Sequence, residues 1–477
     1  MGSQPEGESK SAGTPSSGPR WGRRWAAGLA LPGLLGFAML LLLPCLSFAQ
    51  AIKQGEVLTL SRAIEIALAT QPTILAARYS VKSSEARVGE ALSNYYPQVT
   101  GSTSYSRVHP APSTLGATVP VGGAGTPPGV AGAGASSLSP FSVSSYDLYT
   151  GSMSLNQVVY DFGKTSSQVR INKLNTEASR FDLVNARATV VLNVKQAYYD
   201  VLQAQRNRDV AKESVDQFQR HLEQARGFFE AGTKSRFDVT KAEVDLANGR
   251  VNLISAEDQI KLAIVSLNNA MGIADAPDYE LENILVYGKF DLPFEDALTT
   301  AYAQRPDLLA QTKRTSASKE SITLARKGYF PVLTVNGAYE YTGFDFPLQS
   351  AWTYGLNLSI PVFNGYLTYY QELEARANFA AASANERSLR LDIYSQVQQG
   401  YVNLRDASER IIASEVSLRQ AKENVDLANG RYEAGVGSPL EVTDAITARA
   451  NAESTYTAAL RDYKTAQALI EKAIGAK

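Results

Sequence analysis

The sequence predicts a mainly α-helical protein that also carries membrane-spanning β-strands, with one structural plan used twice along the chain. Three observations predict this class. The N-terminus has the features of a secretory signal, four segments alternate apolar with polar residues, and two stretches are long enough, without proline, for helices of unusual length. The chain has 477 residues, enough for one large domain or two to three small ones.

Composition excludes several classes of function. Lys plus Arg number 46 against 47 Asp plus Glu, so no excess positive charge favours binding to nucleic acid. The sequence has two histidines, His109 and His221, and one cysteine, Cys45. These are too few for a Cys/His metal site or a Cys–His catalytic pair. No Gly-x-Ser-x-Gly or His-Glu-x-x-His motif is present. We therefore expect no enzyme, no catalytic residues, no cofactor and no metal.

The first 51 residues predict a signal peptide. Arginines precede an apolar run over residues 26–46, and small residues follow it. The alternative is a membrane anchor, since the run approaches the length of a spanning helix. Lipidation at Cys45 is a further alternative, disfavoured because Pro44 precedes it. No later run has the apolar length of a membrane helix, so a mature chain that enters a membrane does so by strands.

Paired motifs recur in the two halves of the chain. Gln71-Pro72 is matched by Arg305-Pro306, and a Glu-Ala-Gly sequence ends at both Gly232 and Gly435. A Gly/Ala/Ser/Pro-rich insertion lengthens one loop in the first half only. We predict a tandem duplication. Its expected bounds are 52–272 for the first structural repeat, 273–293 for the linker and 294–477 for the second repeat.

Four segments predict strands with one apolar and one polar face. The clearest sets Trp352, Tyr354, Leu356 and Leu358 against small polar residues. Such alternation over about ten residues suits a strand with lipid outside and water inside. The alternative is a soluble antiparallel sheet with one solvated face. The expected strands are about 98–108, 148–160, 332–341 and 352–363, and the expected lipid-facing residues are Tyr149, Leu155, Trp352, Tyr354, Leu356 and Leu358.

Each strand pair is followed by a predicted long helix. Apolar residues step by three and four inside both, which is a heptad pattern, so each packs along another helix. Shorter helices return after glycine turns, and two upstream helices break near prolines. The expected ranges are about 164–230 and 366–433 for the long helices, 236–271 and 439–474 for the returning ones, and 61–94 and 295–327 for the broken ones.

Four membrane strands cannot close a barrel, because single-chain barrels begin at eight strands and an open edge leaves backbone groups unpaired in lipid. The strands must therefore be pooled between copies of the chain. Two copies give eight strands and a filled interior, whereas three give twelve strands and an open lumen. Small polar residues such as Ser102 and Ser152 favour a wet lumen. The helices then continue the same wall below the membrane.

The order of these motifs resembles the TolC-type outer-membrane efflux duct family. The matching features are the duplication, the Tyr96-Pro97 and Phe330-Pro331 strand starts, the Phe162-Gly163 and Asn364-Gly365 strand ends, and the Glu-Ala-Gly turns. The resemblance implies a homotrimer in the outer membrane, with one shared twelve-stranded β-barrel and a twelve-helix periplasmic α-barrel. It also implies docking to a periplasmic adaptor, or membrane fusion, protein and an inner-membrane pump, as the exit duct of a tripartite efflux or type I secretion system.

The resemblance also assigns roles at the hairpin turns. Gly232, Thr233, Gly435 and Val436 match the family's adaptor-contacting turns; the alternative is that these residues serve turn geometry alone.

Three acidic residues match the family's periplasmic gate. Glu441 and Asp444 correspond to carboxylates that ring the entrance, where crowding would raise some pKa values; the alternative is a solvated helix N-terminus. Asp238 corresponds to an aspartate latched to an arginine, but the arginine position is Gly437 here, and Arg236 or Lys241 are substitutes.

Two other functions compete with the duct. One is a soluble periplasmic coiled-coil scaffold. The other is a passive outer-membrane porin, which is disfavoured because a porin has no use for a tunnel of long helices.

Overall fold

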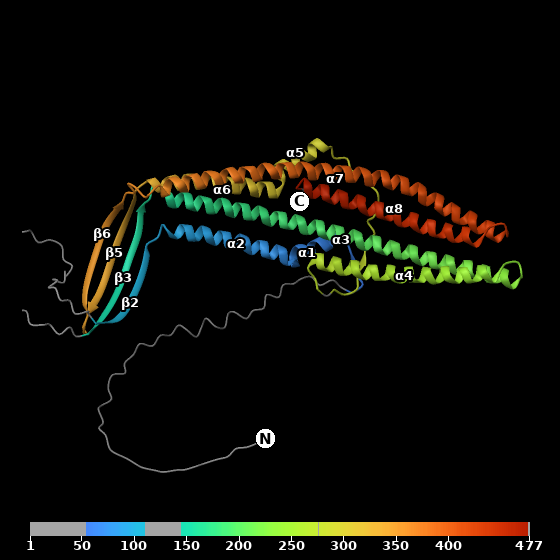
Figure 1. Ribbon diagram of the computed structural model, residues 1–477, viewed down its shortest axis with the longest axis horizontal. Coiled ribbons are helices and arrows are strands. Elements are labelled where there is room, and N and C mark those ends of the chain that lie inside the picture. The colour runs from blue at the N-terminus through green and yellow to red at the C-terminus, as the bar shows by residue number, and fades with distance from the viewer. Residues whose placement is uncertain (1–53, 110–144, 275, 476–477) are drawn as a thin grey trace, which may run out of the picture. The chain divides into compact units, whose positions relative to one another are not determined.

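Two helices of equal length set the architecture (Figure 1). They are α3 (Lys164–Glu230) and α7 (Leu367–Glu433), each of 67 residues, and at 1.5 Å per residue each extends about 100 Å. The computed structural model describes residues 54–109, 145–274 and 276–475. The expected signal peptide, Cys45 and most of the Gly-rich insertion lie outside the described residues.

The remaining elements follow one order in each half of the chain. Two short helices precede a strand pair, and each long helix follows its strand pair and is followed by a returning helix. Among the described residues, no helix has both the length and the hydropathy needed to cross a membrane. The elements are β1 (Val57–Leu58), α1 (Leu60–Thr70), α2 (Pro72–Ser93), β2 (Gln98–Val108), β3 (Tyr146–Tyr160), α4 (Arg236–Met271), β4 (Glu280–Leu281), α5 (Phe294–Gln304), α6 (Pro306–Arg326), β5 (Val332–Gly343), β6 (Gln349–Ser359) and α8 (Pro439–Ala473).

The start of α3 is fixed by a tight bend. The backbone of Phe162 and Gly163 is left-handed, with φ of 53° and 80°. The Asp161 carboxylate accepts hydrogen bonds from the backbone N–H groups of Gly163 at 2.9 Å and Thr165 at 2.6 Å, which caps the free donors of the first turn. The chain therefore changes from strand to helix within a few residues.

The short helix α2 continues the line of α4. Gln71 is extended, as the residue before a proline must be, and this separates α1 from α2. Its side-chain amide donates to the carbonyl of Ala270 at 2.9 Å, at the end of α4. A Cβ on Gly272 would lie 2.9 Å from the Gln71 Cα, so glycine alone fits this approach.

The second half repeats this junction. Arg305 is extended before Pro306, and Gly475 lies against it: a Cβ on Gly475 would meet the Gln304 carbonyl carbon at 3.1 Å. Thus α8 ends where α6 begins. Two pairs of shorter helices, α4 with α2 and α8 with α6, therefore extend over most of the length of the uninterrupted helices.

The helices form a layer with a constant order. Near the sheet, α2 packs on α3, and α6 packs against both α3 and α7. Near the hairpin turns, α4 packs on α3, and α8 packs against both α3 and α7. The α2/α4 line and α7 are therefore the two edges of the layer, and α3 is flanked on both sides by helices of its own chain.

The four long strands form one antiparallel sheet in the order β2-β3-β5-β6. Tyr105 pairs with Tyr149, and Gly337 pairs with Leu155 and Tyr354, which places these residues on one face. The last strand ends at Ser359 rather than near 363. Pro361 explains the difference, because proline has no N–H group to continue the ladder.

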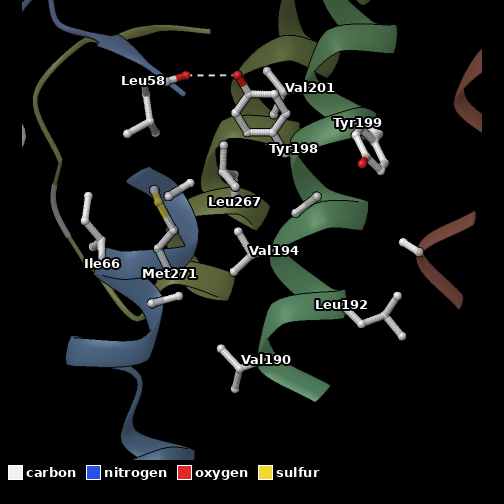
Figure 2. Packing of buried hydrophobic residues seen from close by; sticks show 14 of the residues in the cluster. Leu58, Ile66, Val190, Leu192, Val194, Tyr198, Tyr199, Val201, Leu267 and Met271 are labelled. Carbon is white, nitrogen blue, oxygen red and sulfur yellow. Dashed lines mark hydrogen bonds between the residues drawn. The ribbon is translucent and has the colours of Figure 1, made fainter. Parts of the chain in front are cut away.

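The largest buried cluster joins α1, α3 and α4 beside the small β1–β4 sheet. It includes Ile66, Val194, Leu267 and Met271, all nearly or fully buried. Tyr198 is fully buried among them, and its hydroxyl lies 2.9 Å from the carbonyl oxygen of Leu58 (Figure 2). The same hydroxyl lies 2.9 Å from the carbonyl oxygen of Glu282. One side chain of α3 thereby holds the segment before α1 and the segment between the two halves.

We predict that Tyr198→Phe lowers the free energy of unfolding by about 1 to 2 kcal/mol, because the buried Leu58 carbonyl and the partly buried Glu282 carbonyl lose their shared donor. Thermal unfolding followed by circular dichroism measures the change. Tyr456→Phe is the matched control, since the Tyr456 hydroxyl makes no hydrogen bond within the described residues. Equal effects of the two substitutions would contradict the structural role of the Tyr198 hydroxyl.

Candidate functional site

Both hairpin turns are closed by a left-handed glycine. Gly232 has φ of 71° and Gly435 has φ of 75°, a conformation that side chains rarely adopt. In each turn the next residue donates its N–H back to the preceding helix: Thr233 to the Phe228 carbonyl at 3.0 Å and Val436 to the Arg431 carbonyl at 3.0 Å. The glycines therefore have a geometric role.

The side chains that follow these glycines point outward. Val436 is 69% exposed, and Thr233 is also exposed. An apolar side chain this open at the end of a hairpin is available for contact with another molecule.

Glu441 belongs to the start of α8. Its carboxylate completes a capping box with Ser438 and forms an ion pair of 3.2 Å with Arg431. The hydrogen bond from Arg431, followed by that from the Ser438 backbone, lowers the pKa of Glu441. Within one chain this shift is opposite to the one expected from crowded carboxylates, because a cation and a helix N-terminus face Glu441.

The other two gate residues differ in their surroundings. Asp444 is exposed and makes no hydrogen bond or ion pair within the described part of the chain. Asp238 is half-buried in the first turn of α4. Its negative charge acts to raise the pKa of both His221 and Tyr432. The structure therefore brings Asp238 toward the second hairpin, whereas Asp444 faces solvent.

The position of Gly437 has no room for a side chain. A Cβ there would lie 2.9 Å from the Tyr432 nitrogen and 3.0 Å from the Arg431 carbonyl carbon. Of the two suggested substitutes for the latch arginine, Lys241 forms an ion pair with Asp245, one turn further along α4, rather than with Asp238. Arg236 forms no ion pair among the described residues.

A set of contacts around Tyr432 joins the two hairpins, and the sequence did not reveal it. Tyr432 of α7 is fully buried, and its ring lies 4.8 Å from that of His221 and 5.5 Å from that of Phe228, both on α3. Lys234, in the first turn, lies 5.3 Å from the same ring and donates to the Gly437 carbonyl at 3.4 Å. The heptad positions of α7 marked Tyr432 as buried, but its partners are far away in sequence.

The buried His221 makes no hydrogen bond. It is 2% exposed, and both ring nitrogens lack a partner among the described residues. Burial lowers its pKa; Asp245 and Asp238 act in the opposite direction, and Lys241 acts with burial. The imidazole is therefore held neutral inside the contact between the hairpins.

The sheet presents one exposed apolar face. Trp352, Tyr354, Leu356 and Leu358 of β6 are 67%, 80%, 72% and 57% exposed. Leu155 is 37% exposed, and Tyr149 is half-buried between other aromatic rings. Contact of such an apolar surface with water is unfavourable, whereas contact with lipid is favourable.

The opposite face of the sheet carries hydroxyl groups. Ser102 and Ser152 are 2.8 Å apart, and Ser104 and Thr150 are 2.7 Å apart. Small side chains that bond to one another keep this face polar and shallow. Among the described residues, no group of three or more His, Cys, Asp and Glu side chains is arranged to hold a metal.

Comparison with known proteins identifies the class. The family model described as outer membrane efflux protein matches residues 63–273 and 297–476. The chain belongs to this family, and it is an outer-membrane exit duct for efflux or secretion with a periplasmic helical extension. Nothing in the family match indicates catalysis.

Individual relatives support the same conclusion. Outer membrane protein TolC of Vibrio cholerae is 23% identical over 347 residues, covering 69% of this chain and 77% of the relative. The pyoverdine export outer membrane protein OpmQ of Pseudomonas aeruginosa is 20% identical and covers 62% of this chain and 64% of its own length. The CmeC outer membrane channel of Campylobacter jejuni shares the fold, with a TM-score of 0.73, 19% identity and coverage of 87% and 85%.

We predict that acid weakens the contact between the hairpins through His221. Because burial lowers its pKa below the ordinary 6.5, protonation is disfavoured in the packed state. Stability is unaffected above the ordinary pKa and falls as pH drops through it toward the lowered value.

Thermal unfolding of wild type and His221→Leu between about pH 8 and about pH 5 measures this effect. Leucine fills the same site without a titrating group, so the variant should lose part of the acid dependence. An identical pH profile for both proteins would exclude His221 as its source.

Proposed function

We propose that three copies of this chain assemble into one duct, with a shared twelve-stranded β-barrel and a twelve-helix α-barrel. The observation that carries the proposal is the open sheet. In the part of the chain that the structure describes, β2 and β6 each pair on one side only, and one face of the sheet is apolar and exposed. In lipid every backbone group needs a partner, so the free edges require further strands.

The helical layer supports the same assembly. Its two edge helices carry exposed apolar residues at heptad-like spacing, whereas α3 has its own neighbours on both sides. A second copy placed with its α4 side against α7 covers both stripes and continues the layer around a ring. The exposed residues include Val244, Val251, Ile254, Leu262 and Val265 on α4, and Leu391, Tyr394, Val402, Ile412, Val416 and Leu427 on α7.

Three copies fit the polar face better than two. An eight-stranded barrel is filled by its own side chains, whereas twelve strands leave a lumen. Serines such as Ser102 and Ser152 are too small to fill an interior and suit a surface in contact with water. Tyr149, Leu155, Trp352, Tyr354, Leu356 and Leu358 then face lipid.

The two halves of the chain are proposed as structural repeats, 52–272 and 294–477, with the linker 273–293. Supporting this, both halves have the same order of elements, and the family model matches in two stretches.

The hairpin tips are proposed as the periplasmic end of the duct. There, Gly232, Thr233, Gly435 and Val436 contact a periplasmic adaptor protein, which links the duct to an inner-membrane pump. The support is that the turn side chains Thr233 and Val436 are exposed. Asp238, Glu441 and Asp444 belong to the gate, where Glu441 and Asp444 from each copy surround the entrance.

Assembly tests the proposal directly. The mature protein, purified from outer membranes in a neutral detergent, should have the mass of three chains and should conduct ions in planar bilayers. Leu356→Arg should reduce the membrane-inserted trimer, because a charge near the middle of the bilayer costs about 2 to 4 kcal/mol per chain on the lipid face.

Asn357→Ser, a change on the opposite face, is the matched control and should assemble normally. A soluble single chain would contradict the duct and favour the coiled-coil scaffold. Normal insertion of Leu356→Arg would contradict the assignment of this face to lipid.

The gate carboxylates make a second prediction. Replacing Glu441 with Gln and Asp444 with Asn removes charge but preserves the capping box, which accepts Gln. In planar-bilayer recordings, the divalent-cation concentration that halves conductance should rise about tenfold, which corresponds to about 1.4 kcal/mol of lost cation binding.

The control is the replacement by Gln of Glu415 and Glu423, two exposed carboxylates of α7 that precede the second hairpin turn. Unchanged cation block in the Glu441/Asp444 variant would remove these residues from the entrance.

A further inference from the structure

A cavity of about 750 Å³ lies between α1, α3 and the junction of α8 with α6. This volume is within the range of small-molecule binding sites, about 300 to 1,000 Å³. Its walls are largely apolar and include Leu68, Val184, Val191 and Pro306. The hairpin tips and the strands, which carry the proposed gate and lipid surface, contribute nothing to it.

The charged groups of the cavity are unbalanced. Arg187, Lys195 and Lys472 line it together with a single carboxylate, Glu471. Glu471 is already bound to Lys195 at 2.5 Å. Arg187 and Lys472 form no ion pair among the described residues. The cavity therefore has two cations without an ion-pair partner among the described residues: Arg187 at its solvent-exposed side and the half-buried Lys472.

The surroundings of Lys472 add to this imbalance. Burial, and next the charge of Arg305, lower the pKa of Lys472, while Asp307 acts in the opposite direction. The guanidinium of Arg305 is itself buried, and its Nη1 has no acceptor among the described residues. Arg305 is paired with Asp307 at 2.9 Å, so the uncompensated charge is that of Lys472, and a bound anion would offset the cost of its partial burial.

The cavity does not lie at an edge of the helical layer, where another copy of the chain would pack. It lies along α3, which has helices of its own chain on both sides, whereas the open edges of the layer are the α2/α4 line and α7. The cavity therefore remains within one chain when the proposed trimer forms.

We propose that this cavity binds an anionic amphiphile with one hydrocarbon chain. Arg187 and Lys472 bind its carboxylate, sulfate or phosphate head, and Leu68, Val184 and Val191 contact its tail. A purely apolar ligand would leave the two cations unpaired, and a cationic one would be repelled. The site is separate from the proposed gate and does not depend on which cargo the duct exports.

Quenching of a single tryptophan by a brominated chain tests the site. The mature protein has Trp352 alone, because Trp21 and Trp25 lie in the expected signal peptide. Trp352→Phe combined with Val184→Trp places the reporter at the cavity. The protein is studied in lipid nanodiscs, with its assembly mass checked first, so that failure to assemble is seen separately from failure to bind.

Bromododecanoate should quench the reporter saturably, whereas bromododecanol and bromododecyltrimethylammonium should bind at least about tenfold more weakly, since charge-assisted hydrogen bonds contribute most of the difference. Equal quenching by all three probes would overturn the proposal and indicate partition into the lipid.

Two variants locate the binding. Arg187→Met with Lys472→Met keeps the side-chain length and should weaken bromododecanoate binding about tenfold or more. Lys173→Met with Lys212→Met, two exposed lysines of α3 outside the cavity, should leave it unchanged. Equal affinity of the two double variants would overturn the assignment of the head group.

A third variant tests the tail. Ala188→Phe fills the cavity and should abolish saturable binding in a protein of unchanged assembly mass and helix content. Retained binding would overturn the proposal.

Mass spectrometry of an organic extract then separates two sources of the same chemistry. An anionic lipid retained by wild type and absent from Ala188→Phe is a resident of the envelope, whereas an empty wild type that binds the probe takes its ligand from passing molecules.

Discussion

The unmet backbone hydrogen bonds at the two edges of the sheet constrain the rest of the molecule. Among the described residues, β2 bonds only to β3 and β6 only to β5. An exposed edge in lipid is costly, and the apolar face beside it is unsuited to water. Both requirements are met when identical chains supply the missing strands. In the proposed assembly the helices follow the same ring, and the exposed apolar residues on the two edge helices of the layer are consistent with it.

Two junctions of the same design join the shorter helices of the layer end to end. An extended residue before a proline, Gln71 or Arg305, ends one helix and begins another, and a glycine, Gly272 or Gly475, lets the end of a third helix approach closely. Because of these junctions, four shorter helices run as two lines beside two uninterrupted ones. The buried Tyr198 adds a fixed point at the middle of α3.

Local rules made much of this architecture predictable. Prolines indicate where helices break, alternation indicates strands, and the spacing of apolar residues indicates which helix faces are buried. Pro361 shows how one residue ends β6 earlier than the alternation suggests. The contact of Tyr432 with His221 and Lys234 was not predictable, because it depends on how two hairpins meet in space.

The interrupted lines of helices have a mechanical consequence. A continuous α-helix resists bending because its hydrogen bonds run without a gap, so α3 and α7 act as stiff rods. The lines α4/α2 and α8/α6 have no such continuity at Gln71 and Arg305, where separate helices meet and, at Gln71, a side-chain hydrogen bond to Ala270 joins them. Bending of the layer at this level is therefore resisted mainly by α3 and α7, which pass both junctions without a break.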